Sequence, residues 1–220
     1  MVTYKPDFKK AYVLANEILL MSRTINTFPF SVTKMIKEIS DIQCCSFERA
    51  QKYSVDIESL GSESSVLTEY AGRLIVFYNQ LEVGERIRFS MLHEVGHYFL
   101  VHKVITDDIG LYEKQEIEVN YFAAQLLMPE QILVEFQKRG KRIDADFLVN
   151  SFKVSKEAAN KRIETLHKIK PEYRSKEEKE FDDLILVKYK SFLDTVVPNT
   201  NPLDWFDNEF ERQRERDSWY

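Results

Sequence analysis

Apolar side chains recur at helical spacing from the start of the chain. Between about 7 and 23 they lie three or four positions apart, at Phe8, Ala11, Tyr12, Ala15, Ile18 and Leu19. This spacing predicts an amphipathic first helix. After the break at 28–30, Ser31 or Thr33 can cap a second short helix that runs to about Ile39. Residues 42–47 then predict a short strand.

Two runs rich in β-branched and aromatic residues follow a polar loop at 58–65. They are separated at Ala71-Gly72, so the pattern predicts a hairpin with strands near 66–70 and 73–78. The edge of such a sheet could bind an extended peptide as an added strand, which we expect beside 73–78. The alternative is that the hairpin only supports the helix that follows it.

Helical patterns dominate the next part of the chain. A helix is expected from about 85 to 103, followed by a loop at 104–113. A further helix should begin near Lys114 and stop at Met128-Pro129, because proline disfavours helix at the preceding residue.

The pattern after Pro129 predicts one helix at 130–139, ended by Gly140, and then a helix, a turn and a helix at 146–166. The second layout resembles a helix-turn-helix unit. Its second helix is locally basic, at Lys156, Lys161, Arg162, Lys168 and Lys170. Contact with DNA and docking of a protein partner both stay open for this helix.

The last part of the chain is charged and then apolar. A charge-rich run at 176–180 precedes an apolar helix at 181–193, and a linker-like break follows at 198–202. We expect the final segment to form a short helix that docks through Trp205, Phe206 and Phe210.

Composition bounds the class of protein. A chain of 220 residues with 44% hydrophobic residues can form one domain with an appendage, or two small ones. Its net charge of −5 gives no basic field toward nucleic acid or an anionic membrane. Without a signal peptide or a membrane span in the pattern, we expect a soluble, cytoplasmic protein. The neighbours Cys44 and Cys45 match no zinc pattern and are interpreted as thiols in a reducing compartment.

One stretch, 91–97, carries candidate chemistry. His93 and His97 are four apart on the expected helix, so both imidazoles can reach one metal ion from the same side. In the H-E-x-x-H arrangement the histidines bind zinc, and the glutamate, here Glu94, takes a proton from a metal-bound water and later delivers one to the leaving amine. The alternative is an amphipathic helix that happens to hold a glutamate between two surface histidines.

Two observations favour the metal. Three of the four histidines, His93, His97 and His102, lie within ten positions, and apolar residues flank the motif, which indicates a buried helix. A buried histidine pair needs a partner, which a metal supplies. Gly96 costs about 1 kcal/mol in a helix relative to alanine, which indicates close approach by another backbone element.

A catalytic zinc needs a third protein ligand and an open position. The metzincin continuation would place a histidine six residues after His97 and a glycine three after it, but those positions hold Lys103 and Leu100. On a continuing helix His102 would lie about 140° around the axis from His97, so we interpret it as a surface or supporting residue. The next helix offers the remaining candidates.

Two sequences in the right order and at the right separation carry a resemblance. His-Glu-Val-Gly-His-Tyr-Phe-Leu at 93–100, followed by Val-Asn-Tyr-Phe-Ala-Ala-Gln-Leu-Leu-Met-Pro at 119–129, resembles the ImmA/IrrE family of metallopeptidases. The resemblance spans roughly 28–166. Its second motif, approximately Glu-x-x-Ala-Asn-x-Phe-Ala, implies Glu116 as the third zinc ligand, with Glu118 as the competitor.

Within that second motif Val119 departs from the usual alanine, which affects packing rather than chemistry. Asn120, one turn after Glu116, could support a ligand through a hydrogen bond.

Together these features predict an α+β fold with a compact zincin-like metallopeptidase core. That core would combine a small antiparallel sheet, the H-E-x-x-H helix and the helix that bears Glu116, with a helical, helix-turn-helix-like part after it. The expected domains are a metallopeptidase domain at 1–140, a helix-turn-helix-like segment at 141–170 and a charged helical extension at 171–220.

The expected activity is that of a zinc endopeptidase, with Zn²⁺ held by His93, His97 and Glu116 and with Glu94 as the base. The resemblance implies a protein substrate, typically a helix-turn-helix repressor of a mobile element, prophage or stress regulon. Rivals are a regulatory protein that docks a repressor or DNA without cutting, and a toxin–antitoxin or phage-defence component. Direct DNA binding is not favoured, and charge reversal at Lys156, Lys161 and Arg162 should slow repressor cleavage.

Overall fold

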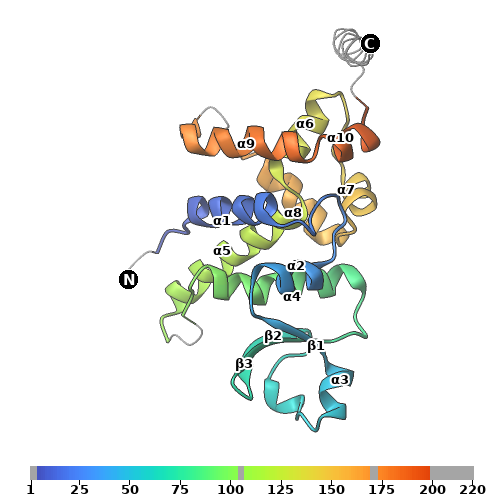
Figure 1. The fold of residues 1–220 in the computed structure, drawn as a ribbon. Coiled ribbons are helices and arrows are strands. Elements are labelled where there is room, and N and C mark those ends of the chain that lie inside the picture. The colour runs from blue at the N-terminus through green and yellow to red at the C-terminus, as the bar shows by residue number, and fades with distance from the viewer. Residues whose placement is uncertain (1–3, 104–106, 169–172, 199–220) are drawn as a thin grey trace, which may run out of the picture.

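The computed structural model describes residues 4–103, 107–168 and 173–198. A small sheet lies at one end of the molecule, and helices stack on it in successive layers (Figure 1). The element nearest the sheet is α4 (Gly84–Phe99), followed by α5 (Ile109–Leu127) and α1 (Phe8–Met21). At the far end α9 (Lys176–Lys188) covers α1.

The remaining elements connect or flank these layers. They are α2 (Val32–Ile39), β1 (Gln43–Ser46), α3 (Phe47–Lys52), the 3-10 turn η1 (Glu58–Leu60), β2 (Ser65–Tyr70), β3 (Arg73–Tyr78), α6 (Glu130–Lys138), α7 (Ala145–Phe152), α8 (Lys156–Leu166) and α10 (Lys190–Val196). Ser31 caps α2, as the sequence predicts. The periodicity gave no sign of α3 or η1, each of which is only one or two turns long.

The sheet is mixed, and this corrects the expectation of an antiparallel sheet. Its strand order is β1-β3-β2, with β2 antiparallel to β3 and β1 parallel to it. The predicted hairpin is therefore confirmed, whereas the pairing of β1 depends on a long connection that strand propensity does not record. Val76 of β3 faces the main core, and Phe77 faces a smaller cluster under α3.

The packing of α4 against α5 depends on Gly96. A Cβ atom at this position would lie 2.6 Å from Val119 Cγ2 and 2.8 Å from Phe122 Cδ1. The close approach expected at Gly96 is therefore made by side chains of α5. Because the two helices touch here, the faces that carry His93, His97 and Glu116 are brought together.

The helix α4 ends at Phe99 and not near 103 as the sequence predicts. Val101 takes the left-handed conformation, with φ of 56°, and its N–H donates to Tyr98 O while His102 N–H donates to His97 O. This pair of bonds is a Schellman ending, which glycine usually forms. The apolar pattern continues past this ending, so periodicity alone overextends the helix.

The helix α5 begins at Ile109, five residues earlier than predicted, because Asp108 caps it by accepting a hydrogen bond from Leu111 N–H. The expected loop is correspondingly shorter, and its residues 104–106 lie outside the described part of the chain.

The helical part after Pro129 shares the main core with the rest of the protein. One hydrophobic cluster contains Leu92 of α4, Phe122 of α5, Ala159 of α8 and Ile185 of α9. The charged run at 176–180 is the first turn of α9 and not a separate segment. The division of the chain into domains at 140 and 170 stays a prediction. The expected terminal helix at 204–216 lies outside the described residues.

Arg162 is buried, and this corrects its assignment to an exposed basic face of α8. Its side chain is 1% exposed, its Nε donates to Met128 O at 2.9 Å, and its Nη2 donates to Gln125. Lys156 and Lys161 remain exposed on the same helix, Lys168 is exposed just beyond its end, and Lys170 lies outside the described residues.

In the part of the chain that the structure describes, no helix has the length and apolar character needed to cross a membrane.

Gly96→Ala should lower the free energy of unfolding. The added methyl gains about 1 kcal/mol of helix propensity but overpacks the interface at a cost of about 1–3 kcal/mol. The loss should be smaller in a Val119→Ala background, where the nearest clashing atom is absent. Chemical denaturation of the four proteins of this double-mutant cycle measures the coupling, and strictly additive changes would contradict the packing account.

Candidate metal centre

Three side chains from two helices converge between α4 and α5. His93 Nε2 and His97 Nε2 lie 3.2 Å apart. The carboxylate of Glu116 lies 3.5 Å from the first and 3.2 Å from the second. Among the described residues, these three form the one group of histidine, cysteine or acidic side chains that could hold a metal ion.

The spacing of the donors fits zinc. Ligand atoms about 2.0–2.1 Å from a tetrahedral ion lie about 3.3 Å from one another. The observed separations of 3.2, 3.2 and 3.5 Å are close to this value, although the two contacts of Glu116 use different oxygens. Two imidazoles and one carboxylate also form a donor set of the kind found at catalytic zinc sites, which keep a fourth position open.

Both histidines present the correct nitrogen. His93 Nδ1 lies 3.2 Å from Asn120 Oδ1, an acceptor that holds a proton on Nδ1 and leaves Nε2 free. Asn120 thus lies within hydrogen-bond distance of a candidate ligand, as the sequence analysis expects. Burial, together with the neighbouring imidazoles of His93 and His102, lowers the pKa of His97 to about 4. The ring of His97 is therefore neutral at physiological pH, as a metal ligand must be.

Glu94 lies between the metal-binding face and the sheet. Its Oε2 accepts a hydrogen bond from Leu67 N–H of β2 at 3.3 Å. Burial raises the pKa of the Glu94 carboxyl, while the imidazole of His93 opposes the increase. A carboxylate whose pKa is raised toward neutrality is suited to accept a proton and release it again.

Glu118 and His102 do not join the three donors. Glu118 points to the other side of α5, where its Oε2 lies 3.0 Å from His102 Nε2. His102 Nδ1 lies 3.0 Å from His97 Nδ1, so His102 stands behind a candidate ligand. His102 is therefore not a surface residue, since its side chain is 5% exposed. Sequence reasoning missed its pairing with Glu118, although three histidines within ten positions were a signal.

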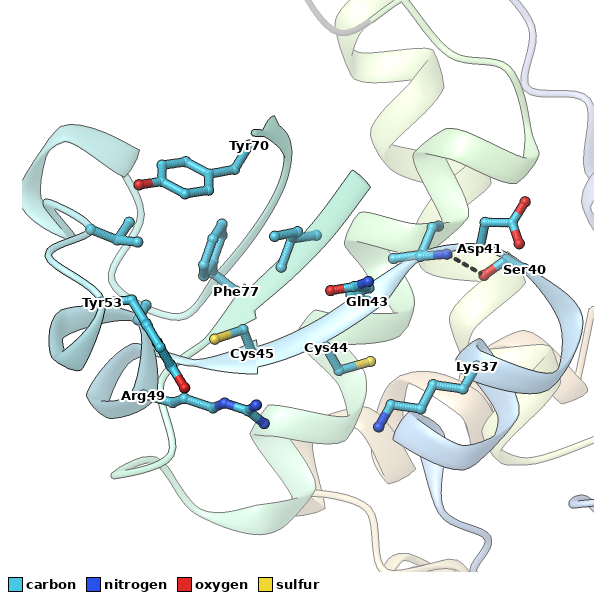
Figure 2. A pocket seen from close by; sticks show the side chains of 14 residues that line it. Lys37, Ser40, Asp41, Gln43, Cys44, Cys45, Arg49, Tyr53, Tyr70 and Phe77 are labelled. Carbon is cyan, nitrogen blue, oxygen red and sulfur yellow. Dashed lines mark hydrogen bonds between the residues drawn. The ribbon is translucent and has the colours of Figure 1, made fainter. Parts of the chain in front are cut away.

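A hollow of about 560 Å³ lies elsewhere, along β1 between the end of α2 and α3 (Figure 2). Cys44 and Cys45 line it together with Lys37, Arg49 and other residues, and none of the metal-site residues does. Burial raises the pKa of the Cys44 thiol to about 11 and that of Cys45 in the same direction. Both cysteines are free thiols that stay protonated at neutral pH, so they are poor nucleophiles.

Two imidazoles and a carboxylate on adjacent helices, with a further carboxylate beside them, define a metallopeptidase-like site. A family model described as the IrrE N-terminal-like domain of the M78 peptidases matches residues 48–164. The match covers more than half of the 220 residues, and the chain belongs to this family of peptidases, the ImmA/IrrE family. The comparison with curated proteins gives no match.

We expect one zinc ion per chain after purification without chelator, because His93, His97 and Glu116 converge on one point. His97→Ala should lose most of the metal, as measured by elemental analysis. His167→Ala is the matched control, since His167 is exposed beyond the end of α8 and should leave the zinc content unchanged.

A metal-loaded crystal structure would also test the choice between the two glutamates. We expect a Glu116 oxygen about 2.0–2.2 Å from the ion. A wild-type protein that stays empty when offered zinc, or a structure with Glu118 at that distance instead, would contradict the assignment.

Proposed function

We propose that the protein is a zinc-dependent endopeptidase that cleaves a protein substrate. The observation that carries the proposal is the convergence of His93, His97 and Glu116 directly beside a half-buried Glu94. A bound zinc ion would polarise the scissile carbonyl and lower the pKa of a water toward about 7. Membership of a peptidase family supports the same reaction class.

Glu94 is the proposed general base. Its carboxylate would accept the proton of the attacking water and deliver a proton to the leaving amine. The hydrogen bond from Leu67 N–H fixes its position, and the raised pKa of the carboxyl brings proton transfer nearer to neutral pH. His93, His97 and Glu116 would hold the ion and take no proton themselves.

The substrate would lie along β2, and this corrects the expectation that it lies beside 73–78. Residues 73–78 form β3, which is paired on both edges. The tight turn between Tyr70 and Arg73 makes these two a hydrogen-bonded pair, so the backbone groups of Leu67 and Glu69 point away from β3. Because Leu67 N–H is bonded to Glu94, an extended peptide could pair with the remaining outward groups of this edge, Leu67 C=O and the N–H and C=O of Glu69.

Glu94→Gln should keep the fold and the zinc but reduce cleavage at least about a hundredfold, because an amide cannot accept a proton from water. The assay is co-expression with a helix-turn-helix repressor encoded by a neighbouring gene, followed by mass spectrometry of the fragments. If the protein acted only by docking, without catalysis, the Glu94→Gln variant would instead relieve repression as well as wild type does. That result in a reporter strain, with the repressor intact, would defeat the peptidase proposal.

A helix-turn-helix repressor is the proposed substrate, and α7–α8 is its proposed docking surface. The exposed face of α8 carries Lys156 and Lys161, with Lys168 just beyond its end, but Glu157 and Glu164 lie on it as well. Such a mixed face supplies few contacts for DNA phosphates, and the burial of Arg162 removes one more. A protein partner with its own mixed charges fits this face better.

Charge reversal as Lys156→Glu with Lys161→Glu should slow repressor cleavage and leave the zinc content unchanged. Lys176→Glu with Lys179→Glu makes the same charge change on the exposed start of α9 and serves as the control. Arg162 is left intact because its guanidinium is buried. Cleavage rates equal to wild type in the α8 variant, or sub-micromolar binding of duplex DNA that this variant loses, would contradict the docking surface.

A further inference from the structure

Behind His97 lies a pair of polar side chains that the proposed reaction does not use. His102 Nδ1 is 3.0 Å from His97 Nδ1, and His102 Nε2 is 3.0 Å from Glu118 Oε2. The side chains of His102 and Glu118 are 5% and 4% exposed, respectively. Three groups therefore form a continuous line from Glu118 through His102 to the candidate ligand.

The chemistry of the two ends fixes the direction of the hydrogen bonds. A carboxylate only accepts, so Glu118 requires a proton on His102 Nε2. A neutral imidazole with Nε2 protonated presents Nδ1 as an acceptor, and this atom faces His97 Nδ1. His97 must then carry its own proton on Nδ1, which leaves the Nε2 lone pair directed at His93 and Glu116.

We propose that Glu118 and His102 are positioning residues for the metal centre. They hold His97 in the tautomer and the ring orientation that a metal requires. The inference rests on the proposed zinc site and deepens it. His102 cannot itself bind the same ion, because both of its ring nitrogens are already engaged. His93 has an equivalent partner in Asn120, so each histidine ligand has its own acceptor.

The backbone around His102 is built to bring it into this place. Val101 is a β-branched residue in the left-handed conformation, which is unfavourable for such side chains. Its side chain is 81% exposed, so packing of the side chain does not explain the conformation. The turn instead ends α4 and directs His102 N–H to His97 O at 2.9 Å. Strain of this kind persists where the surroundings require it.

Contacts from other elements hold Glu118 in turn. Asp7 N–H, just before α1, donates to Glu118 Oε1, and Lys114 Nζ lies 3.4 Å from the same oxygen. Lys10 of α1 donates to Leu100 O at the end of α4. The start of α1 therefore bonds Glu118 directly and holds the end of α4, two residues before His102, through Leu100 O.

The affinity for zinc tests the inference independently of cleavage. Competition titration of the metal-free full chain with Zn²⁺ and a chelating dye gives the dissociation constant. His102→Phe removes the acceptor and should weaken binding about tenfold to a hundredfold. His102→Gln keeps an acceptor and a donor and should recover part of that loss. His167→Phe is the matched control and should bind zinc as wild type does.

The tautomers of His97 and His102 in the zinc-loaded wild type can be measured as a second test. This measurement does not require the variants to fold. Long-range ¹H–¹⁵N NMR should show His97 protonated on Nδ1 and His102 protonated on Nε2 alone. A His102 protonated on Nδ1, or His102→Phe with wild-type zinc affinity, would overturn the positioning role while leaving the zinc site intact. A wild-type protein that does not bind zinc would overturn both the positioning role and the zinc site.

Discussion

The contact between α4 and α5 is the constraint on which the site depends. Two histidines on one helix present their ring nitrogens on one side, but a third metal donor must come from another helix at a fixed distance. Gly96 permits the required close packing of α4 and α5, since Val119 and Phe122 occupy the space that a side chain would need. The same interface lies within the main hydrophobic core, so the stability of the core and the geometry of the donors are one property of this pair of helices.

The other side of α4 is equally constrained. The backbone N–H of Leu67 in β2 donates to the Glu94 carboxylate, so one hydrogen bond holds the proposed base against the edge strand. The edge is free because β1 pairs with the opposite side of β3. A three-stranded sheet thereby presents one unpaired backbone edge beside the donors, and the small size of the sheet keeps that edge short.

Local periodicity predicts those features that depend on neighbours in the chain. The placing of His93, Glu94 and His97 on one helix follows from their spacing, and the hairpin follows from Ala71-Gly72. Properties that depend on distant contacts are not encoded in that way. The parallel pairing of β1 and the burial of Arg162 each require partners remote in sequence. The turn at Val101 has local hydrogen bonds, but the left-handed conformation of a β-branched residue does not follow from its residue type. The preference for Glu116 over Glu118 came from family resemblance, since both glutamates fit a helical pattern.

The buried guanidinium of Arg162 has a consequence for cooperativity. It lies 4.0 Å from Glu130 and donates to Met128 and Gln125 at the end of α5. Opening α8 away from the protein would break these buried hydrogen bonds, and each buried polar group left without a partner costs about 1–3 kcal/mol. Small fluctuations of α8 are therefore suppressed. The helix pair α7–α8 and the helix that carries Glu116 should unfold as one cooperative unit.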